Sequence, residues 1–305
     1  DQVIVSRGAK QSIYNLMQSL LNPGDEVLIP APYWVSYPDM ALLAEAKPVF
    51  ISGSIESCLK ITPQQLEAAI TEKTRLFIIN SPSNPTGMVY THAELNELAK
   101  ILLRHPKVFI LTDDIYEHIY WGSESFNNII NICPELYDRT LVLNGCSKAY
   151  AMTGWRIGYA AGHKEVISAM SNIQSQSTSN PNSIAQFAAV AALTGKQDSV
   201  QHMNEIYHQR HRFFLAGLND IPGVHCLSAQ GAFYSFPSFH TFIGTNKKFG
   251  SDYELADFLL NNANVATVPG SAFGAPGYLR LSYALDNASL EKALIQLKAA
   301  LAGLA

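Results

Sequence analysis

The sequence is poor in charge. Only 15% of its 305 residues are charged, against about 25% in typical globular domains. The 21 lysines and arginines are outnumbered by 25 aspartates and glutamates, which leaves a net charge of −4. No overall positive field therefore attracts nucleic acid or an anionic membrane surface. The scarcity of charge also favours a surface that is partly removed from water by association with another chain.

Paired cysteines and long apolar runs are absent as well. Cys58, Cys133, Cys146 and Cys226 form no CxxC pair, which predicts free thiols in a reducing cytoplasm rather than a disulfide framework. No apolar run approaches the ~18 residues of a membrane span, and the first residues match no signal peptide. The 48% share of hydrophobic residues excludes disordered, collagen-like and coiled-coil chains. The composition predicts a soluble, globular, cytoplasmic protein.

Short apolar runs alternate with helical patterns through the first half of the chain, which is typical of an α/β fold with a largely parallel sheet. Two of the helices begin with capping-box pairs, Thr62 with Gln65 and Thr91 with Glu94. The strands are expected at about 3–5, 26–30, 48–51, 75–80, 107–112 and 140–144.

The pattern changes in the second half. Helical patterns occupy roughly 163–220, and strand-like segments follow at 231–237, 264–268 and 278–283, with further helices near 251–262 and 287–302. We interpret this as a smaller α+β domain that begins within the long helix near 210. The predicted division is therefore a large domain, 1–210, and a small domain, 211–305.

Gly8-Ala9-Lys10 lies between a predicted strand and a predicted helix. Small residues there allow backbone N–H groups to approach an anion, and the start of the helix adds a favourable potential. An ordinary strand-to-helix turn is the alternative. The segment is neither a phosphate loop ending in GKS or GKT nor a GxGxxG fingerprint.

Two further candidates follow predicted strands, at the edge where α/β sheets bind ligands. Asn84 is held between two prolines in the segment 81–87, although the same sequence also makes a good turn. Asp113 ends the next strand and Tyr116 follows three residues later, so both groups can face one ligand. Capping of a helix by Asp113 is the alternative.

The stretch 145–158, GCSKAYAMTGWRIG, contains Lys148 among small and aromatic residues. Such a setting lowers the pKa of an amine and makes it nucleophilic, and Arg156 is placed for an anion. His208 and His211 are three apart on a predicted helix among arginines, with no HExxH pattern. We expect these two histidines to lie on a solvated basic face rather than to bind a metal.

Taken in order, these features resemble the class I aminotransferases, pyridoxal 5′-phosphate (PLP) enzymes of fold type I, which have a large domain with a mostly parallel sheet and a smaller α+β domain. The segments 32–38, 81–87 and 151–159 are most similar to the bacterial aspartate aminotransferase subgroup. The resemblance runs from residue 1 to about 302 and is carried by Gly8-Ala9, Trp34, Asn84-Pro85, Asp113, Tyr116, Lys148, Arg156 and Arg280.

The resemblance implies how PLP is held and used. Lys148 would attach the cofactor and move the proton at the substrate α-carbon. Asp113 would pair with the ring nitrogen, and Tyr116 and Asn84 would bind the 3′-oxygen. Trp34 would stack on the ring, although a core role for this tryptophan stays open.

The cofactor phosphate would lie on the amides of Gly8, Ala9 and Lys10, with a contact from Arg156. Family members often have a serine three residues before the lysine, where this chain has Gly145. Ser147 is not an obvious substitute for that serine.

The resemblance implies small-molecule partners, namely amino acids and 2-oxo acids. Arg280 matches the arginine that binds the substrate α-carboxylate, and Trp34 and Asn84 also border the substrate. Lys10 is expected either to bind the second carboxylate of a dicarboxylic substrate or to be an ordinary first-turn lysine. Aspartate and 2-oxoglutarate are the favoured pair. Aromatic or broad-specificity transamination, C–S β-lysis on the same scaffold and a non-catalytic PLP sensor are the alternatives.

A homodimer with shared active sites is also implied, since Ser179-Asn180-Pro181 resembles a segment that reaches the neighbouring subunit's site. The chain starts at Asp1 rather than at Met, whereas family chains begin well upstream. We therefore expect a truncated chain that binds PLP weakly and turns over poorly.

Overall fold

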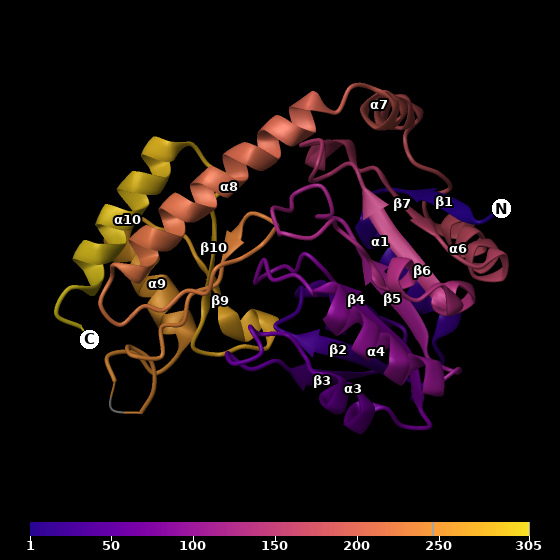
Figure 1. The fold of residues 1–305 in the computed structure, drawn as a ribbon, viewed down its shortest axis with the longest axis horizontal. Helices are drawn as coiled ribbons and strands as arrows, with labels where there is room; N and C mark the ends of the chain where they lie inside the picture. Colours follow the sequence, from indigo (N-terminus) through magenta and orange to yellow (C-terminus); the bar gives the residue numbers. More distant parts are fainter. Residues whose placement is uncertain (246, 305) are drawn as a thin grey trace.

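The computed structural model describes residues 1–245 and 247–304 and contains a seven-stranded sheet in the order β1-β7-β6-β5-β4-β2-β3 (Figure 1). The strands β2 to β6 pair in parallel, and β7 runs antiparallel to both of its neighbours. This confirms the predicted α/β class with a mostly parallel sheet. The bounds are β1 (Val3–Ser6), β2 (Glu26–Ala31), β3 (Lys47–Ser52), β4 (Thr74–Asn80), β5 (Phe109–Asp113), β6 (Thr140–Gly145) and β7 (Gly158–Ala161).

Helices cover both faces of this sheet because successive strand residues point to opposite sides. In β4, Leu76 and Ile78 pack in one core cluster with α1, α2 and α6, whereas Phe77 and Ile79 pack in another with α3 and α4. The bounds are α1 (Ala9–Leu20), α2 (Ser36–Leu43), α3 (Pro63–Ala69), α4 (His92–Arg104), α5 (Ile129–Ile132) and α6 (Lys164–Ser177), with short 3₁₀ turns at Pro134–Arg139 and Thr153–Trp155.

The capping boxes lie where the sequence predicted them. The hydroxyl of Thr62 accepts a hydrogen bond from the Gln65 amide, and that of Thr91 accepts one from the Glu94 amide. In each pair the glutamine or glutamate side chain accepts from the backbone N–H of the threonine. Both helix starts are therefore set by local sequence.

The second half of the chain adds α7 (Ser183–Thr194), the long α8 (Asp198–Asn219), α9 (Asp252–Ala263) and α10 (Asn287–Leu301). A three-stranded sheet in the order β8-β10-β9 lies among them. Its strands β8 (Tyr234–Ser235), β9 (Val268–Pro269) and β10 (Leu279–Ser282), with a 3₁₀ turn at Gly270–Phe273, are much shorter than the sequence predicted. The predicted division at residue 210 falls inside α8 and stays a prediction.

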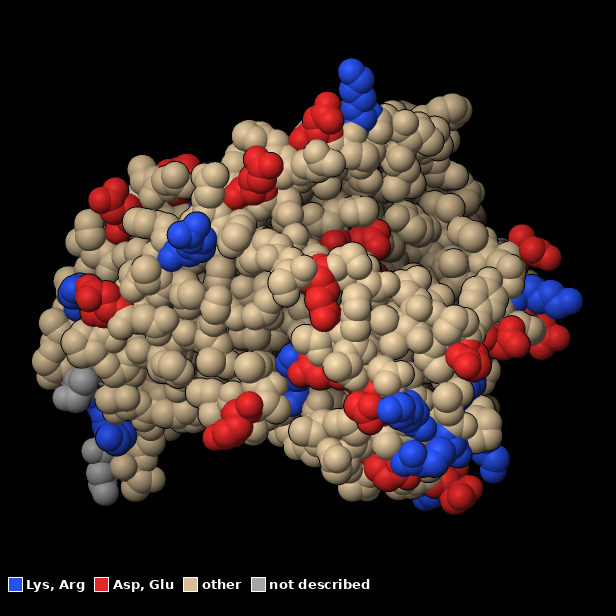
Figure 2. All heavy atoms as spheres, in the orientation of Figure 1, with Lys and Arg blue, Asp and Glu red and all other residues tan. Residues whose placement is uncertain are grey.

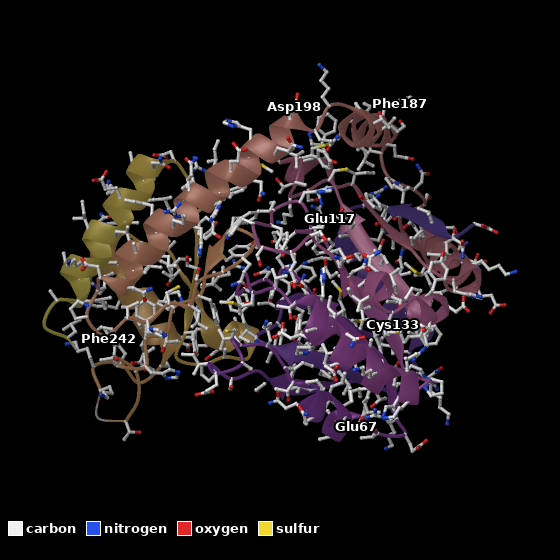
Figure 3. All side chains as sticks on the ribbon, in the orientation of Figure 1. Glu67, Glu117, Cys133, Phe187, Asp198 and Phe242 are labelled. Atoms are coloured by element: carbon white, nitrogen blue, oxygen red, sulfur yellow. The ribbon has the colours of Figure 1, made fainter. Side chains whose placement is uncertain are left out.

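This second unit has an aromatic-rich core of its own. Phe214, Phe239, Phe242 and Tyr283 are each at most 1% exposed and pack with leucines from α9 and α10. Figure 3 places Phe242 in this unit, Cys133 in the first unit and Glu117 near the centre of the molecule. All four cysteines are free, as predicted.

The surface in Figure 2 shows wide uncharged areas between scattered charges of both signs, with the densest group over the α3 and α4 side. Among the described helices, none combines the length and the apolar character that crossing a membrane requires. The most exposed large apolar side chains lie on α7, where Ile184 is 69% and Phe187 is 79% exposed. An exposed apolar face of this kind is typical of a surface that binds another molecule.

We predict that Gly158→Ala lowers the free energy of unfolding by about 1–3 kcal/mol, because overpacking a tight contact costs that much. A Cβ at Gly158 would lie 2.3 Å from the backbone nitrogen of Ala9, so β7 and the start of α1 would have to separate. Urea denaturation measures the effect. Gly154→Ala is the matched control, since nothing lies within 4 Å of its Cβ position, and equal stability of the two variants would contradict the prediction.

Candidate active site

A cavity of about 290 Å³ opens at the carboxyl ends of β4, β5 and β6. Parallel strands end at the same edge of the sheet, so residues far apart in the sequence meet there. Gly8 and Arg280, the two predicted site residues that do not line the cavity, contact residues that do. The predicted residues on its wall are Ala9, Lys10, Trp34, Asn84, Asp113, Tyr116, Lys148 and Arg156.

Strand register places Asp113 in this cavity. Asn80 in β4 lies opposite Asp113 in β5, and its side-chain amide donates to the Asp113 carbonyl at 2.8 Å. The Asn80 side-chain oxygen also accepts from the backbone N–H of Asn84 at 2.9 Å, which holds the following loop. Asn80 therefore connects two candidate residues, although the sequence interpretation did not single it out.

The carboxylate of Asp113 is buried and oriented by two donors. The Tyr37 hydroxyl donates to Oδ2 at 2.6 Å, and the Ile115 amide donates to Oδ1 at 3.3 Å. Burial raises the pKa of Asp113 to about 6, against the opposing effects of the Tyr37 and Ile115 hydrogen bonds and the Lys148 charge. Tyr37 was missed in the sequence. The available signal was its position three residues after Trp34, which places it on the same face of a helical turn.

The side-chain amine of Lys148 makes no hydrogen bond or ion pair to the residues that the structure describes. Its Nζ lies 5.8 Å from the ring centre of Tyr116 and 5.5 Å from that of Phe233. Burial lowers the pKa of Lys148, the positive charges of Arg280 and Arg156 lower it further, and Asp113 opposes them. The amine is thus set up to lose its proton more readily than an ordinary lysine.

Gly8 lies close against the guanidinium of Arg156. Gly8 precedes α1 at φ 81° and supplies no side-chain cap to the helix. A Cβ at Gly8 would lie 2.4 Å from Nη2 of Arg156, so only glycine lets the guanidinium come this near. Within the described chain, the amides of Ala9 and Lys10 donate to no protein acceptor. Free amides at a helix start beside a guanidinium suit a phosphate group.

Gly145 lies in a tightly packed place between strands. A Cβ at this position would lie 3.0 Å from the Cα of Gly158 in the neighbouring strand β7. A serine there would need a shift of a few tenths of an ångström in its neighbours. Ser147 and Thr153 both line the cavity instead, so hydroxyl groups are present on the wall although the sequence did not assign them.

Arg280 enters the site from β10 in the second unit. Its Nη1 donates to Oδ1 of Asn84 at 2.8 Å, and its guanidinium carbon lies 4.5 Å from the ring centre of Tyr234 and 5.0 Å from that of Phe273. No carboxylate pairs with it among the residues that the structure describes. The described contacts therefore include no buried salt bridge to Arg280. Its guanidinium is available to an external anion.

Lys10 lies at the mouth of the cavity. Its Nζ donates to the Ser36 hydroxyl at 3.0 Å and lies 4.7 Å from the ring centre of Trp34. Trp34 in turn packs edge-on against Tyr37, with ring centres 5.3 Å apart. The ammonium group is thus oriented by a hydroxyl and a ring face rather than neutralised by an acid.

The expectation for the two histidines is wrong for His211. Its side chain is 2% exposed and lies beside Trp121, with ring centres 5.5 Å apart. Burial lowers the pKa of His211 to about 4, and the charge of His208 acts in the same direction. The sequence could not show this because Trp121 comes from a distant loop. In the described residues no cluster of metal-ligating side chains occurs.

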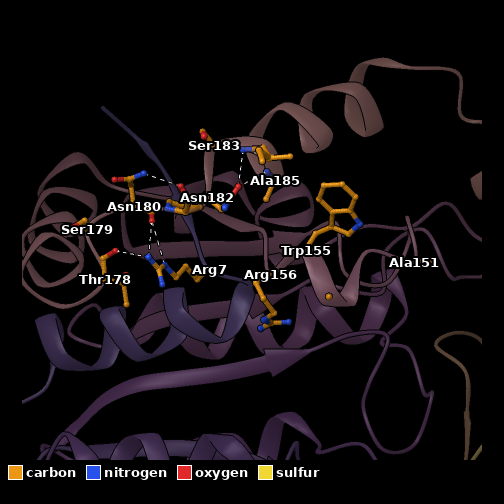
Figure 4. A pocket seen from close by; sticks show the side chains of 13 residues that line it. Arg7, Ala151, Trp155, Arg156, Thr178, Ser179, Asn180, Asn182, Ser183 and Ala185 are labelled. Carbon is orange, nitrogen blue, oxygen red and sulfur yellow. Dashed lines mark hydrogen bonds between the residues drawn. The ribbon is translucent and has the colours of Figure 1, made fainter.

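A second, larger hollow of about 1280 Å³ lies between Arg156 and the segment 178–185 (Figure 4). Arg7 fixes this segment by donating to the carbonyl oxygens of Thr178 and Asn180 at 3.0 and 3.4 Å. Arg156 lines both this hollow and the smaller cavity. The segment 179–181 therefore lies next to the proposed phosphate site.

Comparisons with known proteins identify the family. The model of aminotransferase class I and II matches residues 1–297. An aspartate/prephenate aminotransferase of Nitrosomonas europaea is 53% identical over 298 residues, which are 96% of this chain and 75% of that protein. The crystal structure of the Rhizobium meliloti aspartate aminotransferase superposes with a TM-score of 0.96 at 46% identity, covering 100% of this chain and 77% of that one.

A more distant solved structure, the aromatic aminotransferase from Pyrococcus horikoshii, has a TM-score of 0.92 at 34% identity and covers 98% of this chain and 79% of that chain. The fold and the order of the elements are thus shared across relatives whose names differ in substrate. The predicted family resemblance is confirmed. The chain belongs to the class I and II aminotransferase family.

Proposed function

We propose that this chain is a PLP-dependent aminotransferase that takes the amino group of aspartate and gives it to a 2-oxo acid, with 2-oxoglutarate as the preferred acceptor. The observation that carries the proposal is the convergence, on one 290 Å³ cavity, of the partner-free amine of Lys148 and the buried carboxylate of Asp113. The relatives named aspartate aminotransferase support the choice of amino donor.

The residues present fit PLP at three points. The amides at the start of α1 and the guanidinium of Arg156 would hold the phosphate, and the missing Cβ of Gly8 lets the guanidinium lie beside these amides. Asp113 would hold the ring nitrogen. Lys148 would hold the aldehyde carbon. When bound, the cofactor supplies an electron sink that stabilises negative charge at the substrate α-carbon.

Lys148 would act as the proton carrier at the substrate α-carbon. An amine whose pKa is lowered by burial and by neighbouring arginines spends more time neutral, and only the neutral amine accepts a proton. The aromatic rings of Tyr116 and Phe233 border the amine and keep water from it. Asp113, once ionised, would keep a proton on the ring nitrogen by charge and hydrogen bonding.

Asn84 and Tyr116 would bind the ring oxygen, and Trp34 would cover the ring. These roles are consistent with their places on one cavity wall. The Asn84 side-chain oxygen also accepts a hydrogen bond from the Arg280 guanidinium at 2.8 Å. Asn84 therefore contacts both the place proposed for the cofactor ring oxygen and the arginine proposed for the substrate carboxylate.

Arg280 and Lys10 would bind the two ends of a dicarboxylic substrate. The guanidinium of Arg280 offers the two parallel N–H groups that match an α-carboxylate. The ammonium of Lys10 offers a point charge for the distal carboxylate, oriented by Ser36. A substrate with one carboxylate would use only the first of these charges.

Aromatic or broad-specificity transamination is the second candidate. Trp34 and Tyr37 line the cavity together, and rings of this kind accept aromatic side chains by stacking. The names of the Nitrosomonas and Pyrococcus relatives, which include prephenate and aromatic substrates, favour the same extension. Nothing in the described geometry favours C–S β-lysis over transamination.

A homodimer with shared sites completes the proposal. The apolar face of α7, with Ile184 and Phe187, lies beside the 1280 Å³ hollow that Arg156 lines. A second copy seated there would cover the apolar face and reach the phosphate end of the site. The cytoplasmic location inferred from the cysteines stays a prediction.

Lys148→Ala should abolish covalent retention of PLP, because no other described lysine lines the cavity except Lys10 at its mouth. We expect the purified variant to lose the cofactor during gel filtration and to lose at least about 1,000-fold of its aspartate transamination rate. Absorbance of the bound cofactor and half-reactions with aspartate measure both effects. Lys164→Ala, at the start of α6, is the control, and cofactor retention equal to the wild type in both variants would refute the proposal.

Asp113→Asn should stabilise the cofactor-free protein at pH 8 while weakening PLP binding about ten-fold or more. The folded pKa of about 6 exceeds the unfolded value of 3.8, so the native state binds the extra proton and stability falls as pH rises from about 4 to 6. Removing the charge should therefore raise the free energy of unfolding by about 1–3 kcal/mol at pH 8 and change it little at pH 4. Urea denaturation of both proteins at the two pH values measures the difference. The prediction is contradicted if the stability gained by the variant over the wild type is smaller at pH 8 than at pH 4.

Lys10→Ala should raise KM for aspartate about ten-fold or more, because a charge-assisted hydrogen bond to the distal carboxylate is lost. KM for alanine, which has no distal carboxylate, should change less than two-fold. Half-reactions with each amino acid measure the two values. Lys100→Ala on α4, whose lysine pairs with Glu97, is the control, and an unchanged preference for aspartate in Lys10→Ala would exclude a role for Lys10 in specificity.

A further inference from the structure

The segment that leads into β8 is tied to both loops that carry the candidate site. The amides of Gln230 and Gly231 both donate to the carbonyl of Gly87 at 3.1 Å, at the end of the loop that contains Asn84. On its other side, the Ala232 amide donates to the Ile119 carbonyl at 2.9 Å, just beyond Tyr116. The segment 230–232 therefore lies between the two loops and is hydrogen-bonded to both.

Glycine allows this close crossing. A Cβ at Gly231 would lie 2.6 Å from Cγ of Pro82 and 2.7 Å from the carbonyl oxygen of Ile119. A Cβ at Gly87 would lie 2.7 Å from the carbonyl oxygen of Gly231. Because neither position tolerates a side chain without a shift, the place of Tyr234, three residues after Gly231, is fixed relative to both loops.

The hydroxyl of Tyr234 meets the hydroxyl of Tyr116 at 3.0 Å in a buried position. The two side chains are 6% and 2% exposed, and their rings meet edge to face with centres 6.0 Å apart. Each hydroxyl has one proton and can also accept. When Tyr116 donates its proton to an oxygen in the cavity, Tyr234 is the partner that donates to Tyr116.

The ring of Tyr234 meets Arg280. The guanidinium carbon lies 4.5 Å from the ring centre, within the range of a cation–π contact. Tyr234 in β8 pairs with Ser282 in β10, two residues beyond Arg280, so the antiparallel register sets this contact. The Tyr234 hydroxyl therefore contacts Tyr116, which is proposed to bind the cofactor, and the Tyr234 ring contacts Arg280, which is proposed to bind the substrate carboxylate.

We propose that Tyr234 is a positioning residue that couples the two halves of the site, its hydroxyl holding Tyr116 as a hydrogen-bond donor to the cofactor 3′-oxygen and its ring supporting Arg280 for the substrate carboxylate. The inference rests on the proposed function. It extends that function by assigning a residue that the sequence interpretation did not name.

The charged surroundings favour this arrangement. Asp113 raises and Arg280 lowers the pKa of Tyr116, and Arg280 also lowers that of Tyr234. Burial raises the pKa of Tyr116 well above its usual value. Tyr116 is therefore neutral and keeps the proton it donates. A donor whose own oxygen accepts a hydrogen bond is a stronger donor, because chains of hydrogen bonds polarise one another.

Tyr234→Phe tests the hydroxyl. A weaker donor at Tyr116 stabilises the deprotonated form of the bound cofactor less, so the pH at which the cofactor loses its proton should rise by about 0.3–1 unit. The absorbance of the PLP-loaded protein as a function of pH measures this midpoint without any turnover. Binding of succinate, a dicarboxylate that cannot react, should change less than two-fold because the ring stays in place.

Tyr234→Leu tests the ring. Loss of the desolvated cation–π contact should weaken succinate binding about 5- to 30-fold, in addition to the shift of the midpoint. Tyr207→Phe is the matched control for both readouts. Its ring packs in the same aromatic cluster, with its centre 5.4 Å from that of Phe233, and its hydroxyl makes no hydrogen bond within the described part of the chain.

The outcomes separate this inference from the function on which it rests. If the wild type binds no PLP with a pH-dependent absorbance, the proposed function fails. If the wild type shows that absorbance but Tyr234→Phe moves the midpoint by less than about 0.1 unit, or no more than Tyr207→Phe does, the coupling role is overturned. Since Tyr234→Phe keeps the ring, this outcome does not depend on whether Tyr234→Leu folds.

Discussion

The site depends on keeping the carboxylate of Asp113 buried at the end of β5, where none of the described residues forms an ion pair with it. A buried carboxylate is costly unless donors satisfy its oxygens, and here each oxygen has one donor, from Tyr37 and from the Ile115 amide. Tyr37 can reach it only because α2 begins directly above the strand ends. Trp34, in the turn that leads into α2, also reaches the cavity wall.

Positive side chains outnumber negative ones around the cavity, and this excess favours an anionic ligand. Lys10, Lys148 and Arg156 line the cavity and Arg280 borders it, against the single carboxylate of Asp113. Burial lowers the pKa of Lys148, and repulsion from the charges of Arg280 and Arg156 lowers it further. A ligand that carries a phosphate at one end, with a dicarboxylate beside it, would relieve this repulsion. The preference for anions is thus built into the ligand-free protein rather than created by one residue.

Local patterns in the sequence predicted the local structure. The capping boxes at Thr62 and Thr91 and the strands that end at Asn80 and Asp113 follow from short-range periodicity and hydrogen bonding. The strand ends also explain why so many candidate residues meet at one edge. The three short strands of the second unit lie within or at the edge of the predicted strand-like segments, but their lengths were not predictable. Many apolar residues of these segments pack in aromatic-rich core clusters rather than in a wide sheet.

The residues that the sequence did not reveal share one property, which is contact with a partner far away in the chain. Tyr37 meets Asp113, His211 meets Trp121, and Tyr234 meets Tyr116. Two of these three contacts join the second unit to the first through loops rather than through a common sheet. Sheet register cannot fix such contacts, so backbone hydrogen bonds to Gly87 and the missing side chains of Gly87 and Gly231 must do so. The precision of the site therefore depends on glycines outside the cavity, and a methyl group at either position would disturb it without touching a ligand.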